Sequence, residues 1–196
     1  MLNKYRDYSE EKMKILAKKL PINPNIITLL TLILSILTGT LYITGYIGCG
    51  GLLLLFTGFL DMVDGSIARY HNKTTKFGGF LDSLTDRFSD AIIIFAITLG
   101  NYIHWTIGFI TIIGFFTVSY TRSKSESLGL KCDIGIAERA ERLIIIILGS
   151  WVAGILKWIL GFPTASLILM YTIIIVCILT YYTLIERIYY VWKNIN

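Results

Sequence analysis

Long apolar segments alternate with short polar ones along almost the whole chain. Six windows hold about 20 residues or more, the length that spans a bilayer as a helix, and they are apolar on every side of that helix. A soluble helical bundle would instead be apolar on one face only. The pattern therefore predicts an all-α integral membrane protein with six transmembrane helices. The windows are residues 25–46, 50–69, 77–100, 103–123, 138–160 and 164–187.

Composition and charge agree with a multi-pass protein of the cell membrane. Residues are 55% hydrophobic and only 16% charged, whereas a soluble domain averages about 25% charged. Basic residues gather at both ends of the chain and in two alternate connections, around Lys73 and Lys131. The positive-inside rule places these parts, and hence both termini, in the cytoplasm. The net charge of +5 then faces anionic lipid, so we expect no nucleic-acid partner.

A shorter amphipathic segment precedes the first window. Within residues 9–20, apolar side chains follow helical spacing on one face and lysines occupy the others. Such a helix lies in the plane of the lipid headgroups; the alternative is a solvated basic tail. Pro21 ends the segment. We therefore divide the chain into a cytoplasmic amphipathic juxtamembrane segment, 1–22, and a six-helix domain, 23–196.

Four aspartates interrupt the apolar pattern where the second window ends and the third begins. Asp61 and Asp64 are three residues apart, and Asp82 and Asp86 are four apart, so each pair shares a helix face. A hairpin of the two windows brings the pairs together near the cytoplasmic surface. Carboxylates at membrane depth are costly and indicate a functional site. Four such groups match two hard divalent cations in charge and ligand type.

The residues between the two pairs suit a phosphate ligand. Gly65 lets a bulky group approach the helix backbone, Ala68 is small, and Arg69 offers a fork for phosphate oxygens. Two metal ions can clamp a diphosphate, and a partly free carboxylate can deprotonate an acceptor hydroxyl. The structural alternative is aspartates that pair with Arg69 and Arg87 for helix packing, but two arginines do not balance four carboxylates.

The complete spacing from Asp61 to Asp86 is D-x2-D-G-x2-A-R-x8-G-x3-D-x3-D. It resembles the signature of the CDP-alcohol phosphotransferases, with every defining position present. The resemblance implies six transmembrane helices, an N-terminal amphipathic helix and a homodimer. It also implies two Mg²⁺ or Mn²⁺ ions in each active site, bound by Asp61, Asp64, Asp82 and Asp86, with Asp86 also serving as the general base.

The resemblance further implies a set of contacts to the CDP-lipid. Four of them lie within the span of the motif, and four belong to a Pro-Asn-x-x-Thr entry to the first helix. For this second group the alternative is a proline-started helix with Asn and Thr caps. The implied contacts are Gly65, Ala68, Arg69 and Thr75, together with Asn25, Ile26, Ile27 and Thr28.

Three further segments bear on the acceptor. Residues 81–90, 119–130 and 133–143 look like the phosphatidylinositol-phosphate synthase branch and its archaetidylinositol-phosphate counterpart, whose acceptor is inositol phosphate. A phosphorylated acceptor needs cations, and Arg binds two phosphate oxygens at once; the alternative is ordinary positive-inside charge. Four arginines are candidates for this acceptor phosphate site. They are Arg122, Arg139, Arg142 and Arg187.

The predicted activity belongs to membrane phospholipid biosynthesis. A diacylglycerol- or archaeol-phosphate group passes from a CDP-lipid to inositol phosphate, and CMP is released. Glycerol 3-phosphate is the rival acceptor, as in phosphatidylglycerophosphate synthases, because it would use a similar cationic pocket. A divalent-cation transporter is the alternative from another functional class, because it would move ions rather than catalyse a reaction. It would need carboxylates near mid-membrane and a second polar gate, and the outer halves of the windows offer neither.

Overall fold

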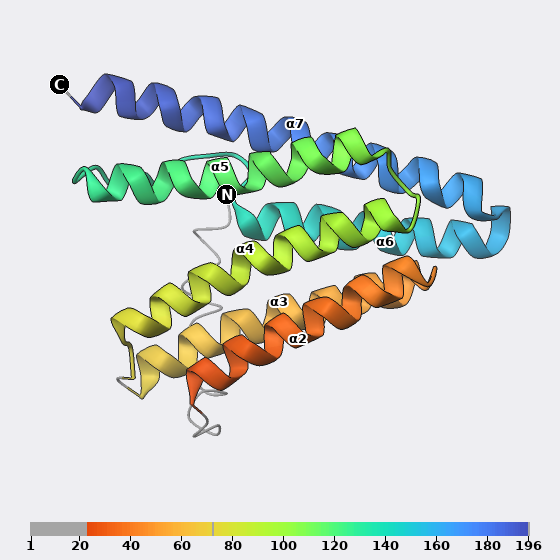
Figure 1. The fold of residues 1–196 in the computed structure, drawn as a ribbon, viewed down its shortest axis with the longest axis horizontal. Coiled ribbons are helices and arrows are strands. Elements are labelled where there is room, and N and C mark those ends of the chain that lie inside the picture. The colour runs from red at the N-terminus through yellow and green to blue at the C-terminus, as the bar shows by residue number, and fades with distance from the viewer. Residues whose placement is uncertain (1–22, 72, 196) are drawn as a thin grey trace.

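The computed structural model describes residues 23–71 and 73–195, which form six α-helices and no strand (Figure 1). The expected interfacial helix at 9–20, and with it the 1–22 segment, lies outside the described residues. The helices are α2 (Pro24–Ile43), α3 (Ile47–Tyr70), α4 (Lys76–Leu99), α5 (Trp105–Ser127), α6 (Arg139–Leu160) and α7 (Phe162–Asn194).

Local side-chain chemistry fixes several of the helix ends. The Asn23 side chain caps α2 by accepting the backbone N–H of Asn25 at 3.1 Å. Thr75 caps α4 in the same way, through the N–H of Gly78 at 2.9 Å. Gly161, at φ 87°, separates α6 from α7 in a backbone conformation that favours glycine. The predicted windows thus become helices that begin and end at identifiable residues.

Two helices run well beyond their predicted windows. Helix α5 continues to Ser127. Helix α7 continues to Asn194 and is 33 residues long. At 1.5 Å per residue α7 is about 50 Å long, more than the hydrocarbon thickness of a bilayer. The apolar pattern stops at the first charged residues, whereas the helical backbone continues through them.

The described helices close into a ring. Each packs against two others, in the order α2–α4–α5–α7–α6–α3 and back to α2. Where α3 meets α6, Gly48 and Gly154 let the backbones approach closely: a Cβ added at Gly154 would lie 2.7 Å from the Gly48 Cα. The α3–α4 connection lies at the left of Figure 1, where the α5–α6 connection also starts before it runs back along α5, and the other three connections lie at the right.

The outer faces of the ring are apolar, as a lipid environment requires. Large side chains such as Trp105, Trp158 and Ile185 are more than half exposed. By length and hydropathy four helices can cross a membrane: α2, α3, α6 and α7. The remaining two, α4 and α5, are 24 and 23 residues long but carry the charged residues of the site. The expectation of an all-helical membrane protein is therefore confirmed.

Candidate active site

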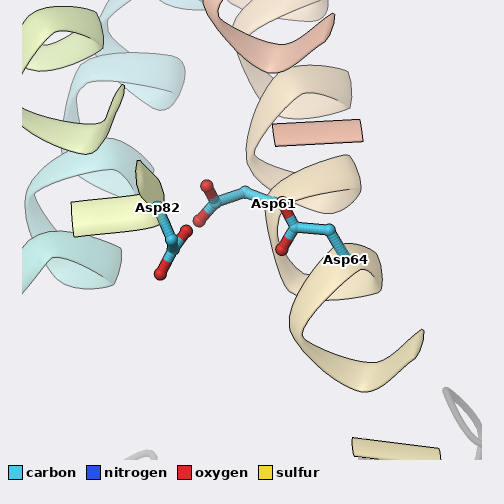
Figure 2. A group of neighbouring side chains, drawn as sticks. All are labelled: Asp61, Asp64 and Asp82. Carbon is cyan, nitrogen blue, oxygen red and sulfur yellow. The ribbon is translucent and has the colours of Figure 1, made fainter. Parts of the chain in front are cut away.

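Three of the predicted metal ligands form one compact group. Asp61 and Asp64 come from α3 and Asp82 from α4, and their side chains point toward one another (Figure 2). One carboxylate oxygen from each residue lies within 4.8 Å of the others. Asp64 is buried and the other two are partly buried. This set of hard oxygen donors, with surplus negative charge, fits Mg²⁺ or Mn²⁺.

A hydroxyl from a third helix orients one of these carboxylates. Thr28 on α2 donates to Oδ2 of Asp64 at 2.7 Å, and both side chains are buried. Hydrogen bonds of this kind fix the direction in which a ligand presents its free oxygen. Thr28 was predicted as a nucleotide contact, and the structure gives it this second role.

The fourth aspartate, Asp86, lies beside the group rather than in it. The Arg139 Nη1 atom bonds Oδ2 of Asp61 at 2.6 Å and lies 2.9 Å from Oδ1 of Asp86. This second contact is an ion pair without hydrogen-bond geometry, and Asp86 Oδ1 accepts no hydrogen bond from any described residue. The guanidinium of Arg139 therefore stands between two carboxylates that were predicted to bind metal.

A cavity of about 190 Å³ opens on one side of the aspartates, and we call it the glycine cavity because Gly65, Gly78 and Gly79 line it. It lies at the N-terminal ends of α2 and α4, where helix dipoles favour an anion. Asp64 and Asp82 also border it. Six of the predicted CDP-lipid contacts line this cavity: Asn25, Thr28, Gly65, Ala68, Arg69 and Thr75.

Two predicted CDP-lipid contacts are not part of that lining. The Ile26 side chain is 59% exposed on the outside of the bundle, and Ile27 is buried against Val63 and Ile67. The helical turn explains the difference, because Asn25 and Thr28 are three residues apart and share a face that the two isoleucines do not.

A second cavity, of about 200 Å³, borders Asp86 and shares no lining residue with the glycine cavity. We call it the arginine cavity because all four predicted acceptor arginines line it, together with Asp86 and Asp90. Arg142 is only 3% exposed and lies over the Phe115 ring, 4.1 Å from its centroid. Its Nε and Nη1 atoms have no hydrogen-bond partner among the described residues. A buried cation with two unused donors is a site for an anion.

Two further arginines of the cavity, Arg187 and Arg122, are more fully engaged. Arg187 donates to the carbonyl oxygens of Ile134 and Val118, both at 2.9 Å, which ties the α5–α6 connection and α5 to α7. Arg122 pairs with Glu126 at 3.0 Å and with Asp133 at 2.8 Å. These contacts give Arg187 and Arg122 a clear part in shaping the cavity, and leave more unused donors on Arg142.

Asp90 also lies at the site, although it is not among the site residues predicted from the sequence. It is 7% exposed, and its two oxygens lie 3.4 Å from Nε of Arg139 and 3.4 Å from Nη2 of Arg142. It therefore pairs with both of these arginines. The signal was its spacing, four residues after Asp86 on the same helix face.

The comparisons with known proteins agree with this geometry. The family model described as CDP-alcohol phosphatidyltransferase matches residues 21–192. The archaetidylinositol phosphate synthase of Methanothermobacter thermautotrophicus is 39% identical, over 100% of this chain and 96% of the relative. A crystal structure of the Mycobacterium tuberculosis phosphatidylinositol phosphate synthase with CDP-DAG bound superposes with a TM-score of 0.78 at 27% identity, covering 92% of this chain and 93% of that one.

The same mycobacterial enzyme has also been solved in complex with manganese and citrate. That structure superposes with a TM-score of 0.79 at 27% identity and covers 92% of this chain and 88% of the other. A divalent metal in this neighbour accords with the carboxylate group of Asp61, Asp64 and Asp82.

Proposed function

The chain belongs to the CDP-alcohol phosphatidyltransferase family, and from this premise we propose that it transfers a lipid phosphate group from a CDP-lipid to inositol phosphate and releases CMP. The names of its relatives support inositol phosphate as the acceptor, because the similar archaeal protein is an archaetidylinositol phosphate synthase and the solved neighbour a phosphatidylinositol phosphate synthase. The preference for inositol phosphate over glycerol 3-phosphate as the acceptor rests on these names and on the arginine cavity.

One observation carries the proposal: two cavities with no lining residue in common border the aspartates. The glycine cavity reaches Asp64 and Asp82, and the arginine cavity reaches Asp86. Phosphoryl transfer places the attacking and the leaving oxygen roughly in line across the phosphorus. An acceptor in the arginine cavity and a nucleotide in the glycine cavity would meet this requirement at the carboxylates.

Asp61, Asp64 and Asp82 would hold the divalent metal, with Asp86 as the fourth ligand of a two-ion site. When bound, Mg²⁺ or Mn²⁺ supplies positive charge that stabilises the diphosphate oxygens and the departing CMP. Thr28 keeps Asp64 directed into the site, as its hydrogen bond of 2.7 Å indicates.

The remaining chemistry falls to side chains of this chain. Asp86 accepts the proton from a hydroxyl of the acceptor, and the resulting oxygen forms a bond to the lipid-side phosphorus. The bond from that phosphorus to the bridging oxygen of the diphosphate breaks, and CMP departs with the electron pair. Arg69 and the N-terminal ends of α2 and α4 line the cavity in which CMP would carry its negative charge.

The acceptor phosphate would bind in the arginine cavity. Arg142 offers two unused donors there, at a position that is 3% exposed. An uncharged acceptor such as free inositol would bring no negative charge to these two donors, whose burial without a hydrogen bond is costly. The cavity therefore favours a phosphorylated acceptor.

The same reading supports six membrane spans and a cytoplasmic active site. The two helices of lower hydropathy, α4 and α5, are as long as their neighbours and sit in the ring between helices that can span. The basic α3–α4 and α5–α6 connections lie at the same end, which the positive-inside rule assigns to the cytoplasm together with both termini. A homodimer remains part of the proposal on family resemblance.

Acceptor competition tests the proposal directly. Purified protein is given CDP-archaeol or CDP-diacylglycerol with inositol 1-phosphate, inositol, glycerol 3-phosphate or serine, and CMP is measured. We expect CMP only with inositol 1-phosphate and a divalent metal. If CMP is released only with glycerol 3-phosphate, the protein is of the phosphatidylglycerophosphate synthase type instead. Cation flux in proteoliposomes without CDP-lipid, and no CMP with any acceptor, would overturn the transferase assignment.

A further inference from the structure

Arg139 lies on the border between the carboxylate group and the arginine cavity. It lines the cavity, yet its Nη1 atom bonds Asp61 at 2.6 Å and lies 2.9 Å from Asp86. Its neighbour on the same helix, Arg142, lines the same cavity, and among the described residues it pairs with Asp90 rather than with Asp61 or Asp86. Arg139 therefore touches both halves of the site, and Arg142 touches one.

The position of Arg139 conflicts with a metal bound at the aspartates. Asp61 contributes a ligand oxygen to the group that fits a divalent ion, and its Oδ2 atom already accepts from Arg139. A guanidinium and a doubly charged ion repel each other strongly within a few ångströms when both are partly shielded from water. The two cations would compete for Asp61 and Asp86, so Arg139 has to give up these contacts when an ion is bound.

The arginine cavity offers the guanidinium an alternative place. Asp90 lies 3.4 Å from Arg139 Nε and faces that cavity, so it can hold Arg139 after Nη1 has left Asp61. The donors released in this way would join the two unused donors of Arg142. A phosphate monoester carries enough charge and enough oxygen acceptors for both guanidinium groups.

We propose that Arg139 couples metal binding to acceptor binding: it neutralises Asp61 and Asp86 until a divalent ion takes them, and only then binds the acceptor phosphate. This inference rests on the proposed function, since it assumes a phosphorylated acceptor in the arginine cavity. Its consequence is an order of events in which the acceptor site is completed only in the metal-loaded protein. By thermodynamic linkage each ligand then strengthens the binding of the other.

The first measurement is metal affinity without any substrate. Calorimetric titration of the full-length protein with Mn²⁺ compares the wild type, Arg139→Gln and the matched control Arg142→Gln. Removing the competing guanidinium should tighten Mn²⁺ binding about ten-fold or more in Arg139→Gln, because a hydrogen bond to a charged group no longer has to be broken. The control loses one charge from the same cavity and should change by less than about three-fold. Equal changes in the two variants would contradict the proposal.

The second measurement is the affinity for inositol 1-phosphate, with and without saturating Mg²⁺. Without Mg²⁺, Arg139→Gln and the wild type should bind it equally, because Arg139 is held by the aspartates. With Mg²⁺, the variant should bind about ten-fold more weakly. Arg142→Gln should bind more weakly in both conditions. If Arg139→Gln loses the same factor in both, Arg139 always faces the acceptor and the coupling is wrong.

The two measurements separate failure of this inference from failure of the proposed function. If neither variant alters inositol 1-phosphate binding, the acceptor assignment fails, whatever the metal titration gives. Arg139→Lys guards against a folding defect, since it keeps the charge but cannot bridge two carboxylates with a planar fork. It should retain the wild-type elution profile and give an Mn²⁺ affinity between those of the wild type and Arg139→Gln; a wild-type affinity would contradict the bridging role.

Discussion

Thr28 on α2 donates its hydroxyl hydrogen to Oδ2 of Asp64 on α3 over a distance of 2.7 Å. Both side chains are at most 4% exposed, so water does not replace the contact. The first helix of the described chain therefore helps to build the metal site, although the motif that carries the aspartates lies on the next two helices. The bond connects the glycine cavity, which Thr28 lines, to the carboxylate group.

Thr28→Val should weaken metal binding while the fold is kept. Valine has the shape of threonine without the hydroxyl, so Asp64 would lose its orienting donor, and such losses typically cost about ten- to a hundred-fold in metal affinity or activity. The Mg²⁺ dependence of CMP release measures the effect. Thr31→Val is the matched control, because Thr31 is equally buried on the same helix and donates to the Thr28 carbonyl instead. Equal effects of the two variants would show that the bond to Asp64 has no special part.

Asp64→Asn should lower the rate of CMP release and raise the stability of the metal-free protein. Three carboxylates whose oxygens lie within 4.8 Å repel one another when no ion is bound, and Asp64 is the most buried of them. We expect CMP release to fall at least about a hundred-fold. In EDTA the variant should gain about 1 kcal/mol, or about 2–4 °C in Tm. Thermal unfolding in EDTA and in Mg²⁺ checks this: the gain should vanish when the wild type is loaded with metal, and a variant less stable than wild type in EDTA would contradict it.

Asp86→Asn should separate proton transfer from metal binding. Asp86 lies outside the compact group of three carboxylates and borders the arginine cavity, where the acceptor hydroxyl would arrive. General-base catalysis typically contributes about 10²–10⁴-fold, so kcat should fall by that order. Calorimetry with Mn²⁺ should show a smaller loss of affinity than for Asp64→Asn. Near-normal turnover of Asp86→Asn would refute the base assignment.

Arg142 and Arg69 should give opposite kinetic signatures. Arg142 lines the arginine cavity and Arg69 the glycine cavity, so under the proposed function each would contact one substrate only. Arg142→Gln should raise KM for inositol 1-phosphate about ten-fold or more and leave KM for the CDP-lipid unchanged, and Arg69→Gln should do the reverse. Initial rates over both substrate concentrations measure the two constants. A variant that raises both values equally would indicate that the cavities are not separate binding sites.

The sequence predicted the helices and the aspartates well because both depend on local pattern. Apolar windows gave all six helices of the described chain, and the spacing of Asp61, Asp64 and Asp82 predicted a shared site that the structure contains. Positions three or four residues apart share a helix face whatever the helix packs against, so such a site can be predicted before the packing of the helices is known.

What the sequence did not predict depends on contacts between distant segments. Arg139 was expected to face the acceptor phosphate, and no local pattern indicated that it would reach Asp61, 78 residues earlier in the chain. Lys157 is another case: its amine donates to the Gly45 carbonyl at 2.7 Å, at the turn between α2 and α3. Only the closed ring of helices brings these partners together.

Two glycines should respond differently to substitution, and together they test whether the glycine cavity binds nucleotide. A Cβ added at Gly65 would lie 3.4 Å from Arg69 Nη1, the end of a flexible side chain, so Gly65→Val should fold normally. Because Gly65 lines the cavity, the added carbons should occupy ligand space and raise KM for the CDP-lipid about ten-fold, with KM for inositol 1-phosphate unchanged. Initial-rate kinetics measure both.

Gly154→Val is the control, because it adds the same carbons at a glycine outside the site. Its Cβ would lie 2.7 Å from the backbone of Gly48, at the point where α3 and α6 cross. The two helices would have to move apart to make room for it. This variant should lower the free energy of unfolding by about 1–3 kcal/mol and leave both KM values of the remaining folded protein unchanged. If Gly65→Val also left the KM for the CDP-lipid unchanged, the nucleotide would have to bind elsewhere than in the cavity between α2, α3 and α4.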